Sequence, residues 1–256
     1  MILKDIIDII ESVAPLSGQE SWDNSGLQIG HKEADIASVL CCTDVTEAII
    51  DEAIAKGCNL VLSHHPLLFH GLKTIQGLTF QERVVEKALR AAICVYSSHT
   101  AMDVYLHGVS GRMAEKIGIT DYRILVPTGE DIGLGVIGDL QTPVSIDRFL
   151  ALVKEAFHVP AIRYTRPAGD TIRRVALGGG ACGEYFEEAL AQGADAFVSA
   201  EFKHHELLAA DGRIMLLDIG HFESEQYTKE LFRELLADAP VNVLFAEADK
   251  SPINVY

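Results

Sequence analysis

Two adjacent histidines, His64 and His65, directly follow the apolar run Asn59–Ser63. Neutral imidazoles are good ligands for zinc, iron, cobalt or manganese. In open α/β sheets, functional groups gather at the carboxyl ends of strands, where the loops face a crevice. Because neighbouring side chains on an extended backbone diverge, the two imidazoles can serve two different ions. The alternative is a pair of surface histidines at the start of a loop.

Two further groups of the same residue types follow other apolar runs. His99 and Asp103 come after Ile93–Ser97, although Asp103 taken alone could equally cap a helix or a turn. His221 and Glu225 come after another predicted strand and are four residues apart, so a helix places both on one face. Because all three groups follow predicted strands, we interpret them as parts of one metal site.

Two other motifs compete with this interpretation. Gly178–Gly183 matches the dinucleotide-binding pattern G-x-G-x-x-G after a predicted strand, and Glu201 follows the next strand. A tight strand-to-helix turn is the alternative that we favour, since the strand-end histidines indicate different chemistry; its backbone N–H groups could still receive a phosphate. His204 and His205 lie in a predicted helix, where adjacent side chains splay about 100° apart, so we do not expect both to be ligands.

Strand-like and helix-like segments alternate along the chain. Strands are predicted at 38–42, 59–63, 93–97, 134–137, 162–164, 175–177, 196–199, 214–218 and 241–245. Helices are predicted from Leu3, from Asp44, and at 80–91, 110–117, 145–157, 185–192, 204–210 and 223–236. Repeated βα units predict an α/β fold with largely parallel sheets covered by helices. We place a domain boundary near residue 125, where Val126–Gly129 breaks the pattern, giving domains 1–125 and 126–256.

Composition excludes several classes of protein. The net charge of −16, without any basic block, argues against nucleic-acid binding, which depends on Lys and Arg at phosphates. No stretch reaches the ~18 uncharged apolar residues of a membrane helix. The opening residues lack the basic start of a signal peptide. The five cysteines lack C-x-x-C spacing, so we expect free, buried thiols and a cytoplasmic location.

Four short motifs together carry a family resemblance. They are Trp22–Gln28, Ser63–Leu67, His99–Asp103 and Gly220–Glu225. With these motifs, in this order and across most of its length, the chain resembles the NIF-three-like proteins, often labelled GTP cyclohydrolase 1 type 2 homologues. Two departures stand out: no room exists for the inserted domain of longer members, and Ser199–Glu201 replaces the Thr-Gly-Asp of many members.

The resemblance implies a dinuclear metal centre in a cleft between two α/β domains. It assigns His64, His65 and Asp103 of the first domain, and His221 and Glu225 of the second, as metal ligands. It also implies a homohexameric ring. The metals it implies are two divalent ions per chain, with zinc, iron, manganese, cobalt and nickel all open.

We therefore expect a dinuclear metal-dependent hydrolase that acts on a nucleotide or a related phosphorylated small molecule. Glu225 is the better candidate for a carboxylate that bridges the ions. His99 is the candidate catalytic residue, as a proton donor or a group behind the ligands, with a purely structural hydrogen bond as the alternative. The competing hypothesis is a non-catalytic, metal-stabilised ring that binds a regulatory partner protein.

Overall fold

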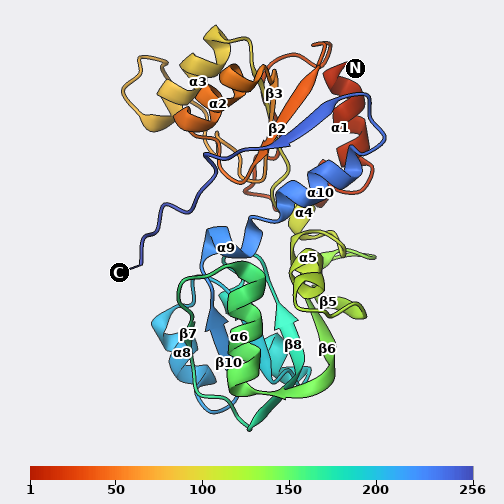
Figure 1. Cartoon of the computed structure of the whole chain (residues 1–256), viewed down its shortest axis with the longest axis vertical. Helices are drawn as coiled ribbons and strands as arrows, with labels where there is room; N and C mark the ends of the chain where they lie inside the picture. The colour runs from red at the N-terminus through yellow and green to blue at the C-terminus, as the bar shows by residue number, and fades with distance from the viewer. Residues whose placement is uncertain (256) are drawn as a thin grey trace. The chain divides into compact units, whose positions relative to one another are not determined.

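The computed structural model describes residues 1–255, which form two compact units, each with its own sheet (Figure 1). The first unit comprises Met1–Met102 and Thr228–Lys250, and the second comprises Asp103–Tyr227 and residues 251–255. Helices flank a sheet in each unit, which confirms the α/β class. Within residues 1–255, no helix is long and apolar enough to cross a membrane.

This division differs from the predicted ranges 1–125 and 126–256. Val126 and Pro127 lie within strand β5 (Tyr122–Pro127), which pairs antiparallel with β6 (Gly133–Ser145), so the predicted boundary falls inside one sheet. The late strand β11 (Asn242–Phe245) pairs with a strand of the first unit instead of the second. A break in an alternating pattern marks a turn between paired strands as readily as a linker, which explains the difference.

The sheet of the first unit has the strand order β1-β4-β3-β2-β11. All neighbours are parallel except the edge strand β1, which runs antiparallel to β4. The central strands are buried along their whole length, as expected for parallel strands covered on both faces. The strands not yet given are β1 (Gly26–Ile29), β2 (Ser38–Cys42), β3 (Leu60–Ser63) and β4 (Cys94–Ser97).

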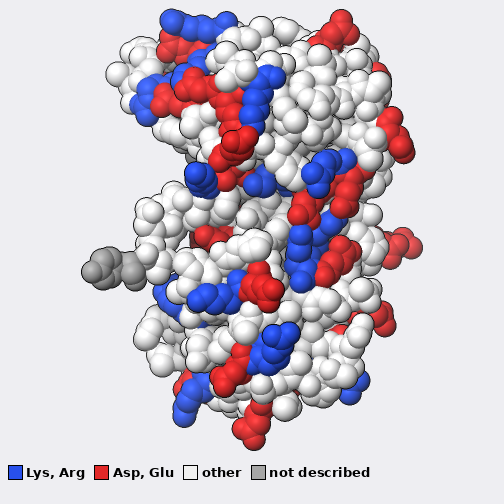
Figure 2. Space-filling view, in the orientation of Figure 1, with Lys and Arg blue, Asp and Glu red and all other residues white. Residues whose placement is uncertain are grey.

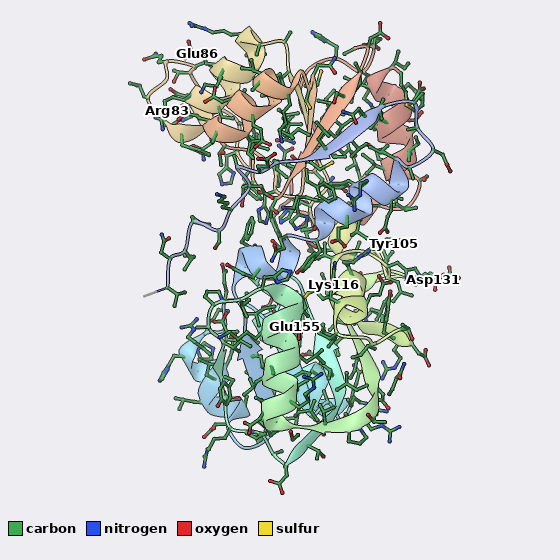
Figure 3. All side chains as sticks on the ribbon, in the orientation of Figure 1. Arg83, Glu86, Tyr105, Lys116, Asp131 and Glu155 are labelled. Carbon is green, nitrogen blue, oxygen red and sulfur yellow. The ribbon has the colours of Figure 1, made fainter. Side chains whose placement is uncertain are left out.

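Helices cover both faces of this sheet (Figure 1). One side carries α2 (Glu47–Lys56) and α3 (Phe80–Arg90), and the other carries α1 (Leu3–Glu11) and α10 (Thr228–Leu235). Acidic and basic side chains lie side by side over α2 and α3 (Figure 2). Arg83 of α3, labelled in Figure 3, donates to Glu47 of α2 at 3.1 Å.

The start of α2 corrects the prediction that this helix begins at Asp44. The N-cap is Thr46, whose hydroxyl accepts from the backbone N–H of Ile49 at 3.2 Å. The helix ends at Gly57, which adopts the left-handed conformation that glycine favours. Asp44 therefore lies in the loop between β2 and α2, at the carboxyl end of a strand.

The sheet of the second unit has the order β5-β6-β8-β9-β10-β7 and is mixed. Only β8, β9 and β10 run parallel, so the expectation of largely parallel sheets is met in the first unit and not here. The short connection from β5 to β6 forces antiparallel pairing, because parallel neighbours need a long crossover. The remaining strands are β7 (Arg163–Tyr164), β8 (Thr171–Leu177), β9 (Ala196–Ser199) and β10 (Met215–Asp218).

Two hydrophobic clusters cover the two faces of this sheet. On one face Phe149 and Val153 pack with strand residues such as Val175, and on the other Phe186 packs with Phe197. Lys116, labelled in Figure 3, lies 4.1 Å from the centre of the Tyr227 ring. The helices of this unit are α5 (Val109–Lys116), α6 (Ile146–Phe157), α7 (Phe186–Ala191), α8 (His204–Ala210) and α9 (His221–Glu225). The short helix α4 (Thr100–Asp103) ends at Asp103, which is the first residue of the second unit.

Candidate metal centre

Three histidines gather at the carboxyl ends of β3 and β4 in the first unit. The parallel ladder places Ser63 opposite Ser97, so the residues that follow the two strands leave the same edge of the sheet. The imidazoles of His64, His65 and His99 have ring centres 4.8 to 5.3 Å apart. One nitrogen from each lies within 4.8 Å of the others, a grouping that could hold a metal ion.

A hydrogen bond from Nδ1 orients each of these imidazoles. His65 Nδ1 lies 2.8 Å from Asp44 Oδ1, and His64 Nδ1 lies 3.3 Å from the carbonyl oxygen of Ser98. Because a carbonyl and an ionised carboxylate only accept, each Nδ1 must carry the hydrogen. In the neutral ring the lone pair then lies on Nε2, which is the usual arrangement of a metal-binding histidine.

His99 is held by Asp23, a residue for which the sequence predicted no role. Its Nδ1 donates to Asp23 Oδ1 at 2.9 Å, and Asp23 Oδ2 accepts from the Thr100 hydroxyl at 2.6 Å and the Ser25 hydroxyl at 2.8 Å. Burial opposes ionisation of this carboxyl, but these hydrogen bonds outweigh it and hold the pKa of Asp23 well below its usual range. The Asp23 side chain is therefore a buried, ionised carboxylate. The sequence offered one indication of its importance, because Asp23 follows Trp22 in a motif that carries the family resemblance.

In the second unit, His221 and Glu225 lie on one face of α9, as their spacing predicted. His221 Nε2 is 3.1 Å from Glu225 Oε2, and His221 Nδ1 is 2.9 Å from Glu201 Oε1. The Glu225 side chain is only 3% exposed. Glu201, considered above only as part of a dinucleotide motif, therefore orients His221 as Asp44 orients His65.

The glycine-rich turn packs directly against this pair. A Cβ added to Gly180 would lie 2.2 Å from Glu225 Oε1 and 3.2 Å from His221 Nε2. The backbone N–H of Gly180 donates to the Ser224 hydroxyl at 2.9 Å, which fixes the turn on α9. The close approach to Glu225 explains the glycine at position 180 without a bound dinucleotide.

Asp103 ends α4 and belongs to the second unit, although it was predicted to lie in the N-terminal domain. Burial raises the pKa of the Cys182 thiol, and the charges of Asp103 and Glu225 raise it further, so both carboxylates lie near that thiol. The five cysteines are free thiols, four of them buried, as expected.

The remaining histidine pair takes no part in these groups. His204 and His205 are both exposed at the start of α8, and neither belongs to a group of potential metal ligands in residues 1–255. The imidazole and carboxylate donors described above do fit divalent ions such as zinc, iron or manganese. Their oriented Nδ1 atoms and the space kept by Gly180 beside Glu225 support that fit.

The fold and these donors define an α/β protein with histidine and carboxylate groups that could bind a metal. The model of the Duf34/NIF3 (NGG1p interacting factor 3) family matches residues 1–252, and the chain belongs to this family. A Clostridium perfringens protein named GTP cyclohydrolase 1 type 2 homolog is 32% identical over 98% of both chains. A Campylobacter jejuni protein of the same name is 28% identical over the full length of both.

Solved structures share the fold. A Staphylococcus aureus hypothetical protein superposes with a TM-score of 0.92 at 26% identity, covering 100% of this chain and 99% of that one. A Bacillus cereus protein related to NIF3 gives a TM-score of 0.91 at 23% identity, with the same coverage. The resemblance predicted from the four motifs is therefore confirmed.

Proposed function

We propose that the chain binds two divalent metal ions through His64, His65, Asp103, His221 and Glu225, and that it hydrolyses a nucleotide or a related phosphorylated small molecule. The observation that carries the proposal is a repeated carboxylate–histidine pair. Asp44 orients His65 in one unit, and Glu201 orients His221 in the other. Such pairs fix the ring orientation and the tautomer of histidines at metal sites.

Bound divalent ions lower the pKa of a coordinated water and polarise an electrophile. The imidazoles of this chain add no charge, so Asp103 and Glu225 supply the negative charge that offsets the ions. Glu225 would be the better held of the two carboxylate ligands, because its side chain is buried and the Gly180 turn limits its movement, and it stays our candidate for a carboxylate shared by the ions.

His99 is the group to which we assign proton transfer. With Nδ1 donating to Asp23, its Nε2 can accept a proton and return it. The ionised Asp23 stabilises the imidazolium that forms, because the two opposite charges are in direct contact away from bulk water. Since His99 also groups with His64 and His65, its role as a third ligand is the competing assignment.

Family membership supports the remaining parts of the proposal. The name carried by the curated relatives makes GTP the first substrate to test. We also propose a homohexamer in the cytoplasm, as the family resemblance implies, and the free cysteines fit a reducing compartment. Light scattering after size-exclusion chromatography tests the hexamer, and a monomer at micromolar concentration would contradict it.

The test of function is a hydrolysis screen of metal-reconstituted protein with GTP, other nucleotides and sugar phosphates. We expect His64→Ala and His221→Ala each to abolish turnover, because each removes a ligand. The matched controls are His70→Ala and His205→Ala, which remove exposed histidines of the same two units and should leave turnover unchanged. Activity that survives both ligand variants would refute the proposal, and so would inactivity of the fully loaded protein against the whole panel. The second result would favour the non-catalytic ring.

His99→Gln separates the two roles of that residue. If His99 moves a proton, the variant keeps its full metal content and loses turnover at least about 100-fold. A matching loss of metal would instead make His99 a ligand.

A further inference from the structure

Two exposed aromatic side chains pack edge to face with the buried imidazole of His99. Trp22, the only tryptophan in the chain, is 60% exposed, and Phe69 is 43% exposed. Their ring centres lie 5.7 and 5.6 Å from that of His99, with planes inclined to it by 70° and 84°. All three residues belong to the first unit. Large aromatic surface is thus left in water beside the group assigned to proton transfer.

The loop that carries Trp22 is fixed on both sides of the ring. Before it, the Glu20 N–H donates to the Thr100 hydroxyl at 2.9 Å. After it, Asp23 is anchored to His99 and Thr100, and the His99 N–H donates to the Ser25 hydroxyl at 3.1 Å. An exposed tryptophan on a flexible loop would need no explanation. The loop of Trp22 is instead held by hydrogen bonds on both sides of the ring. This arrangement favours ligand binding, since the loop has little conformational entropy left to lose when a ligand binds.

The loop of Phe69 is tied to the loop of Trp22. The Asn24 amide donates to the Leu68 carbonyl oxygen, and the Leu68 N–H donates to Gln28 Oε1 at 3.2 Å. These bonds hold the residue next to Phe69 in register with the residues that follow Trp22. The two rings are therefore positioned by one connected network around His99.

We propose that Trp22 and Phe69 form a stacking site for the planar heteroaromatic ring of the substrate, which places that ring beside His99. The proposal deepens and rests on the proposed function, since a nucleobase is the planar part of a nucleotide. Aromatic side chains bind bases through their faces and tolerate different bases, because every base has a π-face. The site should accordingly recognise the base and not the sugar phosphate.

The single tryptophan makes this proposal directly measurable. Trp22 emission is titrated with guanosine monophosphate, guanosine and ribose 5-phosphate, in metal-free and in metal-loaded protein. We expect the two base-containing compounds to quench the emission saturably in both forms, and ribose 5-phosphate to leave it unchanged. Equal quenching by ribose 5-phosphate, or no quenching by any compound, would overturn the proposal.

Variants are compared through the emission of 2-aminopurine riboside, a probe that reports stacking without Trp22. Trp22→Ala and Phe69→Ala should each weaken binding about ten-fold, and Trp22→Phe should restore most of the loss. The matched control is Phe80→Ala, because Phe80 is 42% exposed in the same unit and makes no ring contact with His99 in residues 1–255. Equal affinity in all variants would overturn the stacking site.

The two proposals can fail separately. Base-dependent quenching without turnover in the loaded protein would refute hydrolysis and leave the stacking site intact. Turnover that is unchanged in Trp22→Ala and Phe69→Ala would refute the stacking site and leave the proposed hydrolysis intact. Emission that shifts with protein concentration and ignores nucleosides would mean that a second copy of the chain covers the rings, and would also overturn the stacking site.

Discussion

The two units carry their donor residues on different backbones and with different charge. The first unit contributes neutral imidazoles at the ends of buried parallel strands, where the ladder itself fixes their spacing. The second contributes a histidine and carboxylates, with His221 and Glu225 on the five-residue helix α9. A helix this short is not stable by itself, so its position depends on what packs against it. The site residues of the first unit should therefore tolerate neighbouring changes better than those of the second.

Gly180→Ala should produce the largest effect of the substitutions that test this difference between the units, and the effect should be on metal affinity. The new Cβ would overlap Glu225 Oε1, so the buried carboxylate must move, and metal affinity should fall about 10- to 100-fold. Gly212→Ala is the matched control, because Gly212 has a similar positive φ but nothing within 4 Å of the added Cβ. Both variants should lose about 1–2 kcal/mol of stability from backbone strain, because alanine is disfavoured in the left-handed conformation that both glycines adopt. Isothermal titration with the metal and thermal unfolding measure the two effects, and equal metal affinity in both variants would contradict this account of the turn.

Asp23→Asn should be the largest single change within the first unit. Asp23 accepts hydrogen bonds at both oxygens from His99, Thr100 and Ser25, and an amide must turn a donor toward one of these groups. We expect a loss of about 2 kcal/mol in the free energy of unfolding. Metal content should fall little, because Asp23 contacts none of the proposed ligands directly. Unfolding in urea with elemental analysis checks both; loss of metal without loss of stability would count against this role.

The three histidines of the first unit's candidate site were predictable from the sequence, but the carboxylate that orients His99 was not. His64, His65 and His99 were found because each follows an apolar run that reads as a strand. Asp23 was missed because its contact with His99 depends on β1, which was not predicted. That strand pairs Gly26 with Ser97 and so brings a loop from 76 residues away beside His99.

In the second unit, local spacing found the helix-borne pair and missed its surroundings. The i, i+4 rule was sufficient for His221 and Glu225, since both lie on one short helix. The glycine-rich segment was predicted as a strand-to-helix turn, but its close approach to Glu225 was missed, because G-x-G-x-x-G describes a backbone shape and not the side chains around it. The pairing of β5 with β6, and of β11 with the first sheet, depends on contacts between distant segments. Periodicity within a segment carries no information on those contacts.

Glu82→Gln should have the smallest effect, because Glu82 belongs to none of the groups of potential metal ligands in residues 1–255. The backbone N–H of Leu78 and the Thr74 hydroxyl donate to this buried carboxylate and hold the pKa of Glu82 below its usual value. A lowered pKa means that the contribution to stability is complete above the unfolded-state pKa of about 4.3 and is lost as the pH falls further. The variant should therefore unfold at a slightly lower temperature than wild type at pH 7, and the gap should close below about pH 4. A gap that widens in acid would contradict this sign.

The central proposal is that His64, His65, Asp103, His221 and Glu225 bind two divalent ions per chain, and a metal count tests it most directly. Metal-reconstituted wild-type protein should contain two divalent ions per chain by elemental analysis. Glu225→Gln keeps the volume of the side chain and removes its charge, so it should bind the ions more weakly and retain fewer after dialysis. A reproducible ceiling of one ion or none in the wild type, or full retention in Glu225→Gln, would contradict the account.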